Sequence, residues 1–150
     1  MQKFQISVLT LLLMWFGLAT AGQDRTVALS NAGDKVLLGE HMQILEDPEG
    51  DWTLDQVRDQ FASRFRASES SALNFGFTRS TFWLRIAVDT SGVEGSWFLV
   101  ERHPILDELT LYAPDDQGNY IAQAVGDTRG FGQRPMNHRA FVFALDTDEP

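Results

Sequence analysis

Cysteine is absent from this chain of 150 residues, and lysine is nearly absent. The lack of cysteine excludes disulfides, thiol catalysis and cysteine-ligated metals. Lysine occurs only as Lys3 and Lys35, and the other cationic residues are arginines. The planar guanidinium of arginine suits fixed ion pairs and anion recognition better than a lysine ammonium does. A gene rich in arginine codons is the alternative explanation.

Positive charge is scarce as a whole. The chain carries 12 Lys and Arg against 21 Asp and Glu, which gives a net charge of -9. An acidic surface repels nucleic acid and anionic lipid headgroups, so we expect no nucleic-acid partner. Hydrophobic residues make up 43% of the chain, which excludes disorder as the default state. The length suffices for one domain with a sizeable core.

Known catalytic motifs are also lacking. The sequence contains no Gly-x-Ser-x-Gly, no Gly-x-x-x-x-Gly-Lys-Ser/Thr loop and no His-Glu-x-x-His. The three histidines, His41, His103 and His138, share no metal-ligand spacing. Acidic pairs such as Asp107-Glu108 and Asp115-Asp116 would suit a glycosidase, but so acidic a composition produces them anyway. We therefore expect no enzymatic activity, no metal and no cofactor.

The N-terminus has the layout of a secretory signal peptide. Lys3 precedes an uncharged apolar block at residues 6–18, and Ala19-Thr20-Ala21 offers small residues for cleavage before Gly22. The block is shorter than the ~20 residues that span a bilayer. We therefore predict a signal peptide at residues 1–21, a linker at 22–34 and one exported domain at 35–150. An uncleaved membrane anchor is the alternative.

Alternation of apolar and polar residues dominates the rest of the chain, most clearly between Leu73 and Val88. Apolar residues occupy every second position in two runs, 73–77 and 82–88, on either side of the polar Arg79-Ser80. A period of two, rich in aromatic and branched residues, is typical of strands that bury one face. The pattern predicts two strands that share one core.

Similar short patterns recur along the chain. Further strands are predicted at residues 35–38, 41–45, 96–102, 109–112, 120–125 and 139–145, with a turn at 47–50. The run 96–102 is apolar on both faces, which predicts an inner strand. Strands that recur at intervals of roughly 8–12 residues favour an all-β sandwich.

One helix interrupts this pattern. Thr53 and Gln56 have the spacing of a capping box. Leu54, Val57, Phe61 and Phe65 then fall on one helical stripe. We predict a short helix, roughly 54–61, that caps the sandwich, with the nearby arginines on its solvated side.

Several segments together resemble a known family. They are Leu38-Gly39-Glu40-His41, Ile44-Leu45-Glu46-Asp47, Phe65-Arg66, Leu73-Asn74-Phe75-Gly76, Ser80-Thr81-Phe82-Trp83-Leu84-Arg85, the run 104–112, Gly126-Asp127, Arg134-Pro135 and the run 139–143. In order and spacing they resemble the periplasmic sensor domain of seven-transmembrane receptors with diverse intracellular signalling modules (7TMR-DISM extracellular domain, type 2). The resemblance covers about residues 38–145.

This resemblance implies a jelly-roll β-sandwich similar to carbohydrate-binding modules. It also implies a periplasmic place at the front of an inner-membrane receptor that feeds a histidine kinase or a diguanylate cyclase. The final strands, the membrane bundle and the output domain of that family have no counterpart in this sequence. We therefore expect the sandwich to be incomplete at its C-terminal end, and the inner membrane to be reached through downstream segments.

Trp83 and Arg85 are the first candidates for ligand binding. They alternate with the apolar set of their strand, so an outward Trp-x-Arg would offer a stacking surface and a fork for sugar hydroxyls or a carboxylate. In the alternative interpretation, Trp83 packs under the helix and Arg85 pairs with an acidic neighbour such as Glu101. Trp97 and Tyr112 are similar candidates, with the same two interpretations.

Arginines near the loop 126–135 form a second candidate site. Arg102, Arg134 and Arg139 would favour an anionic ligand there, and surface ion pairing is the alternative. We thus expect a ligand-sensing domain for a carbohydrate or another small molecule. Two other functions stay open: a module that pairs with a second copy or with another sensor ectodomain, and a secreted carbohydrate-binding accessory domain.

Overall fold

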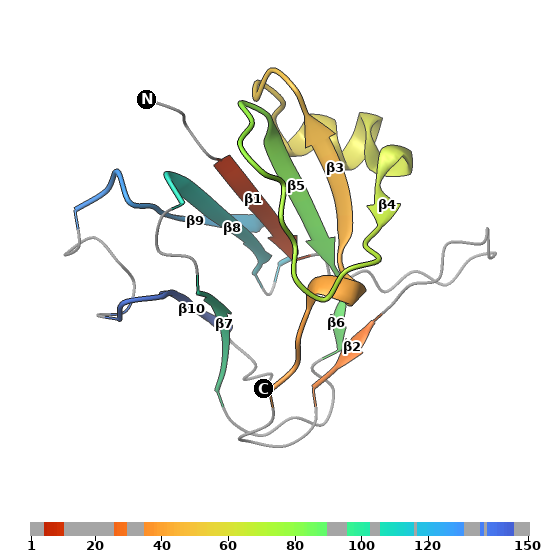
Figure 1. Ribbon diagram of the computed structural model, residues 1–150. Coiled ribbons are helices and arrows are strands. Elements are labelled where there is room, and N and C mark those ends of the chain that lie inside the picture. Colours follow the sequence, from red (N-terminus) through yellow and green to blue (C-terminus); the bar gives the residue numbers. More distant parts are fainter. Residues whose placement is uncertain are drawn as a thin grey trace.

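The computed structural model describes residues 26–29, 35–89, 96–102, 106–115, 117–130, 136 and 138–145, together with the backbone of 5–10 (Figure 1). His103, Arg134, most of the predicted linker and the rest of the predicted signal peptide lie outside the described residues. No helix within the described ranges is long and apolar enough to cross a membrane.

The described chain is mostly β, as predicted, and it forms three sheets. The largest has the strand order β4(Arg66–Ala67), β3(Gln43–Asp47), β5(Thr81–Ile86), β1(Gln5–Thr10), β8(Glu108–Pro114) and β9(Tyr120–Val125). The two-stranded sheets are β10(Phe141–Leu145) with β7(Trp97–Glu101), and β2(Val27–Ala28) with β6(Val88–Asp89). Figure 1 shows the β10–β7 pair set apart from the large sheet, beneath β8 and β9. The two continuous sheets of a jelly roll are not seen among the described strands.

The main core lies between the large sheet and the two small ones. Its most deeply buried members come from all three sheets: Val27, Leu84, Ile86, Val88, Leu109, Leu111, Val125, Phe141 and Phe143. Leu84 and Ile86 lie on one face of β5, as the alternation predicts, and Trp83 faces the other way into a second core. β5 is therefore buried on both faces, which explains its dense apolar sequence.

The predicted strand at 73–77 is wrong. The Asn74 side chain accepts a hydrogen bond from the Gly76 N–H (2.9 Å), and Gly76 has a φ of 64°. This local turn diverts the chain from an extended course. Phe75 stacks on Phe82 with ring centroids 3.8 Å apart, whereas Phe77 is 94% exposed. The strand predicted at 35–38 is also irregular, and a 3-10 turn, η1(Gly39–His41), follows it.

The helical segment begins as predicted but winds differently. The Thr53 N–H donates to Gln56 Oε1 (2.8 Å) and the Gln56 N–H to Thr53 Oγ1 (3.3 Å), which confirms the capping box. The next turn is the wider π form, η2(Gln56–Gln60), in which the Phe61 N–H donates to Gln56 O (3.0 Å). A 3-10 turn, η3(Ala62–Arg64), ends the segment. The predicted stripe of Leu54, Val57, Phe61 and Phe65 does pack on the second core.

β7 is not the inner strand that its apolar sequence predicted. It pairs with β10 alone among the described strands, and Phe98 and Val100 on its outer face are 46% and 47% exposed. Trp97 and Leu99, on its other face, pack against the main core. The apolar outer face of β7 is therefore about half exposed, as far as the described residues show.

β1 comes from the predicted signal peptide. Its backbone lies between β5 and β8 and runs parallel to both. Removal of residues 1–21 stays a prediction, and it would take this strand out of the sheet.

Candidate functional site

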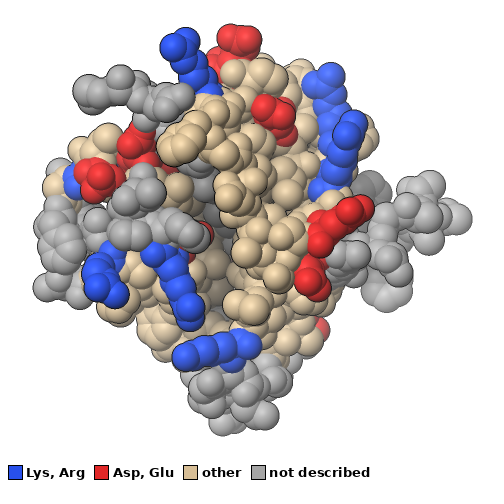
Figure 2. Space-filling model, viewed as in Figure 1, with Lys and Arg blue, Asp and Glu red and all other residues tan. Residues whose placement is uncertain are grey.

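Arginines and aromatic rings alternate over the second core, on the side of the large sheet that faces away from the main core. This arginine–aromatic face consists of Trp52, Arg58, Phe61, Arg64, Phe65, Arg85 and Tyr120. Beneath it lie Leu45, Val57, Trp83 and Tyr112. Figure 2 shows basic side chains along the edge that carries the helical segment and β4, and others spread over the rest of that face.

A buried aspartate stabilises the turn that leads into the helical segment. Asp47, 1% exposed at the end of β3, accepts hydrogen bonds from the Gly50 N–H (2.8 Å) and the Trp52 N–H (3.0 Å). The predicted turn at 47–50 is thereby confirmed, and Gly50 has the positive φ of 70° that this turn requires. The turn presents Trp52 to Phe61, with ring centroids 4.2 Å apart.

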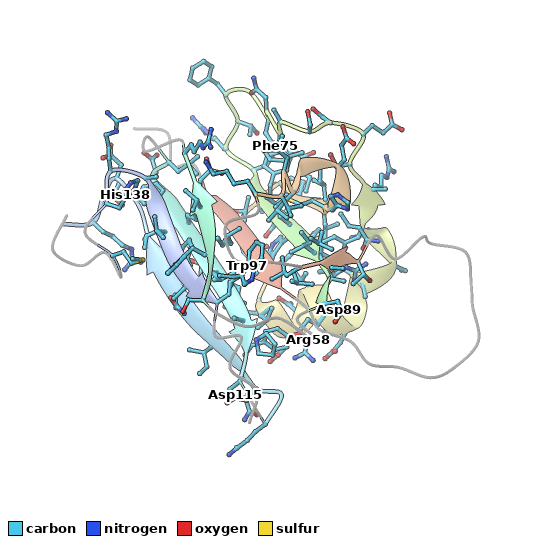
Figure 3. All side chains as sticks on the ribbon, turned by 90° about the horizontal axis from the view of Figure 1, so that it is seen from below. Arg58, Phe75, Asp89, Trp97, Asp115 and His138 are labelled. Atoms are coloured by element: carbon cyan, nitrogen blue, oxygen red, sulfur yellow. The ribbon has the colours of Figure 1, made fainter. Side chains whose placement is uncertain are left out.

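Each arginine of the face lies over at least one ring. The Arg58 guanidinium carbon lies 4.6 Å from the Tyr120 centroid, and that of Arg64 lies 5.0 Å from the Phe61 centroid and 5.9 Å from that of Trp52. Cation–π pairs at exposed sites contribute ~0.5–1 kcal/mol each. Figure 3 shows Arg58 reaching from the helical segment toward the β8–β9 hairpin. The pair therefore joins two elements that are distant in sequence.

Arg85 anchors the face from below. Its guanidinium lies 4.2 Å from the Phe65 centroid, and its Nε donates to Gln43 Oε1 at 2.8 Å. A longer bond runs from Nη2 to the Ala62 carbonyl (3.4 Å). Arg85 thus ties β5 to β3 and to the end of the helical segment.

Trp83 packs beneath the helical segment, as the alternative interpretation of its sequence pattern predicted. It is 3% exposed beneath the helical segment and stacks on Tyr112, with ring centroids 5.9 Å apart. Its indole presents no open stacking surface in this arrangement. The indole Nε1 is buried and has no hydrogen-bond partner among the described groups.

Both tyrosines of the chain border this region. Burial raises the pKa of Tyr112, and the nearby Glu108 carboxylate raises that pKa further. Burial also raises the pKa of Tyr120, against which the Arg58 cation acts in the lowering direction. Both phenols therefore stay neutral over the physiological range of pH.

The predicted site residues do not converge. Trp83, Arg85 and Tyr112 share the second core, whereas Trp97 packs on the main core from β7 (Figure 3). Glu101 is half-buried at the end of β7, and Arg139 is exposed just before β10. Arg134 lies outside the described residues, so the predicted anion pocket stays a prediction.

Sequence reasoning missed four members of the face: Trp52, Arg58, Arg64 and Tyr120. A signal was present for Arg64, because it stands three residues after Phe61, a spacing that brings side chains together on a helix. Nothing local indicates that Arg58 meets Tyr120, because that contact depends on the fold.

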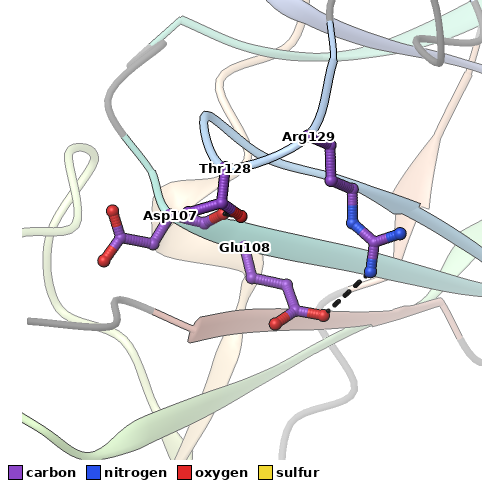
Figure 4. A network of polar contacts seen from close by, with 4 residues as sticks. All are labelled: Asp107, Glu108, Thr128 and Arg129. Atoms are coloured by element: carbon purple, nitrogen blue, oxygen red, sulfur yellow. Dashed lines mark hydrogen bonds and ion pairs between the residues drawn. The ribbon is translucent and has the colours of Figure 1, made fainter.

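A second polar cluster is structural. A Cβ on Gly126 would lie 2.1 Å from the Asp107 carbonyl oxygen, so β8 begins directly against this glycine. The Thr128 hydroxyl donates to the same oxygen (2.8 Å), and Arg129 pairs with Glu108 at 3.1 Å (Figure 4). The acidic pair 107–108 thus positions the loop after β9. Within the described residues, no three His, Asp or Glu side chains form a group that could hold a metal.

The comparison with protein families identifies the chain. The family model described as 7TMR-DISM extracellular 2 matches residues 39–150, which include every described element from η1 onward. The search of curated proteins found no match. The predicted resemblance is therefore confirmed, and the chain belongs to the 7TMR-DISM extracellular 2 family, whose members are extracytoplasmic sensor domains of signalling receptors.

Proposed function

We propose that this sensor domain binds a carbohydrate or another small molecule, with a preference for acidic compounds, at the arginine–aromatic face. One observation carries the proposal: on a chain with a net charge of -9, three arginines on one face are each held over an aromatic ring. A guanidinium stacked on a ring keeps its in-plane N–H groups at the ring edge, where carboxylates and hydroxyls bind.

The face also suggests how binding would be transmitted. Arg58 comes from η2 and Tyr120 from β9, so a ligand that contacts both favours one arrangement of the helical segment against the β8–β9 hairpin. Such a bias shifts the population of domain conformations. In the whole receptor, we envisage a periplasmic domain completed to a jelly-roll sandwich, which passes this bias to the inner-membrane segments.

A thermal-shift screen of the exported protein tests the proposal. The probes are glucose, galactose, glucuronate, galacturonate, phosphate and sulfate. A ligand at about 100 times its Kd adds ~2.7 kcal/mol of stability, which raises the Tm by several degrees. We expect glucuronate or galacturonate to raise the Tm, and the neutral sugars to raise it less.

Three matched variants locate the site. Arg58→Gln and Arg64→Gln each remove one cation from the face and should abolish the shift. Arg79→Gln removes an equally exposed arginine from the loop before β5 and should leave the shift intact. Absence of a shift with every probe, or equal loss in all three variants, would reject the arginine–aromatic face as the ligand site.

A second function is favoured by the half-exposed outer face of β7. Phe98 and Val100 are 46% and 47% exposed on neighbouring outward positions, and exposed apolar patches commonly mark protein interfaces. This observation supports pairing with a second copy or with another sensor ectodomain. Sedimentation velocity over a range of concentrations measures it. Val100→Glu should shift any dimer to monomer, and a wild-type monomer at high concentration argues against self-pairing.

A further inference from the structure

The centre of the large sheet is occupied by residues that export would remove. β1 pairs along its whole length, with residues 5–10 in register with 81–86 of β5 and residues 5–9 with 108–112 of β8. The same residues lie within the predicted signal peptide. Processing after Ala21 would therefore open a slot one strand wide between β5 and β8.

The direction of the strands shows what this slot suits. β3 is antiparallel to both β4 and β5, and β8 is antiparallel to β9. In the large sheet, only the two pairings of β1 are parallel. Its neighbours β5 and β8 thus run the same way with one strand between them. An occupant that runs opposite to β1 would make the whole sheet antiparallel, the more stable pairing per residue and the one usual in sandwiches.

The slot is covered by side chains on both sides, so leaving it empty would be unfavourable in free energy. Leu84 and Leu111 from its two walls lie in the main core. On the other side, Trp83 from one wall stacks on Tyr112 from the other, which bridges the slot. Without a strand between them, the inner backbone groups of both walls would be buried and unpaired, which natural structures avoid.

Trp83 adds a second, independent observation. Its Nε1 is buried without a partner, although its residue lies on the wall of the slot in register with Ser7. A buried indole N–H normally donates a hydrogen bond. No described group supplies that acceptor, so the indole N–H is available to an occupant other than β1.

We propose that the slot between β5 and β8 is a strand-acceptor site, filled in the processed protein by an extended segment of the same polypeptide that follows Leu145. That segment runs antiparallel to both walls and supplies an acceptor for Trp83 Nε1. A segment of the same chain is favoured over a second copy because the tether gives it a high effective concentration at any protein concentration. The inference does not depend on the proposed ligand.

A peptide that imitates β1 tests whether the slot exists. The processed protein, residues 22–150, is mixed with a peptide of residues 2–11 or with the same peptide carrying Val8→Pro, which lacks a backbone donor at its centre. We expect the first peptide to raise the Tm by several degrees and the second to leave it unchanged. The proposal would be overturned if the processed protein is monomeric, unfolds cooperatively and keeps the same Tm with either peptide.

Because the chain has no cysteine, a single introduced thiol reports the place of binding. A peptide with Ser7→Cys should form a disulfide with Thr110→Cys, its register partner, and not with Gly130→Cys in an open loop. Equal reaction at both positions would show that the peptide does not enter the slot.

The occupant is tested with the product of the gene read beyond Pro150. Its own strand should already fill the slot, so the peptide of residues 2–11 should not raise its Tm. Three results would each overturn the choice of occupant. The Tm of the longer product could still rise with the peptide, the gene could stop at Pro150, or the processed protein could fill the slot by dimerising.

Discussion

Replacement of Gly126 by alanine should be severely destabilising, and the size of the effect follows from the start of β8. An added Cβ would lie 2.1 Å from the Asp107 carbonyl oxygen and 2.9 Å from the Glu108 Cα, both of which are backbone atoms. Ordinary contact begins at 3.4 Å, so the two chain segments must separate by about 1 Å. That separation opposes two hydrogen bonds of 2.8 Å, from the Asp127 N–H to Leu106 O and from Thr128 Oγ1 to Asp107 O.

The opposing effects can be weighed. Alanine reduces the entropy of the unfolded chain, which stabilises by ~0.4–1 kcal/mol. Overpacking costs ~1–3 kcal/mol, and each weakened hydrogen bond costs ~1 kcal/mol. The cost prevails, and we expect a net loss of ~2–4 kcal/mol in the free energy of unfolding. Urea titration followed by tryptophan fluorescence measures this loss as a lower midpoint at constant slope.

Gly130→Ala is the matched control, because nothing lies within 4 Å of its added Cβ and its φ is not left-handed. It should raise the stability slightly, by no more than the ~0.4–1 kcal/mol that the lower entropy of the unfolded chain supplies. If Gly126→Ala were as stable as Gly130→Ala, the close contact between the loop after β9 and the start of β8 would be refuted.

Four further predictions concern the helical segment, its face and the two tyrosines. Asp47→Ala leaves two backbone N–H groups without their acceptor and should cost ~2–3 kcal/mol, measured by urea titration, with Asp47→Asn costing less. Thr53→Ala removes one half of an exposed capping box and should cost ~1 kcal/mol in the same assay. Arg58→Gln should raise the pKa of Tyr120 further, because it removes the cation that lowers this pKa. Tyrosinate absorbance against pH, in a Tyr112→Phe background, measures the pKa of Tyr120. An unchanged pKa would contradict the contact between Arg58 and Tyr120. Since the folded state keeps both phenol protons to higher pH than the unfolded chain does, stability should fall as the pH rises above about 10.

Local signals were enough to predict those parts of the fold that local chemistry determines. The alternation in β5, the capping box of Thr53 and the turn at Asp47 each involve residues a few positions apart, and the structure contains all three. The run 73–77 shows where the same reasoning fails. Its period of two was that of a strand, but the Asn74 side chain and the positive φ of Gly76 turn the chain instead.

The candidate site was less predictable, because its contacts cross the sheet. Trp83 was recognised as a special residue, but whether it faced solvent or the helical segment depended on what packs above it. Arg58 was read as part of a solvated face, and its contact with Tyr120 arises only when η2 lies over the β8–β9 hairpin. Long-range contacts of this kind leave no trace in the spacing of a single sequence.

Trp83 links the proposed ligand face to the proposed strand-acceptor site. On one side it supports the layer of Val57 and Phe61, on which Arg64 lies. On the other it forms the wall of the slot and, with Tyr112, bridges it. An empty slot would let this pair of rings move, and the arginines above them would lose their fixed positions. Ligand affinity should therefore rise when the slot is filled, so the peptide of residues 2–11 should enlarge the glucuronate-induced shift of the processed protein. A shift of the same size without any strand in the slot would separate the two sites.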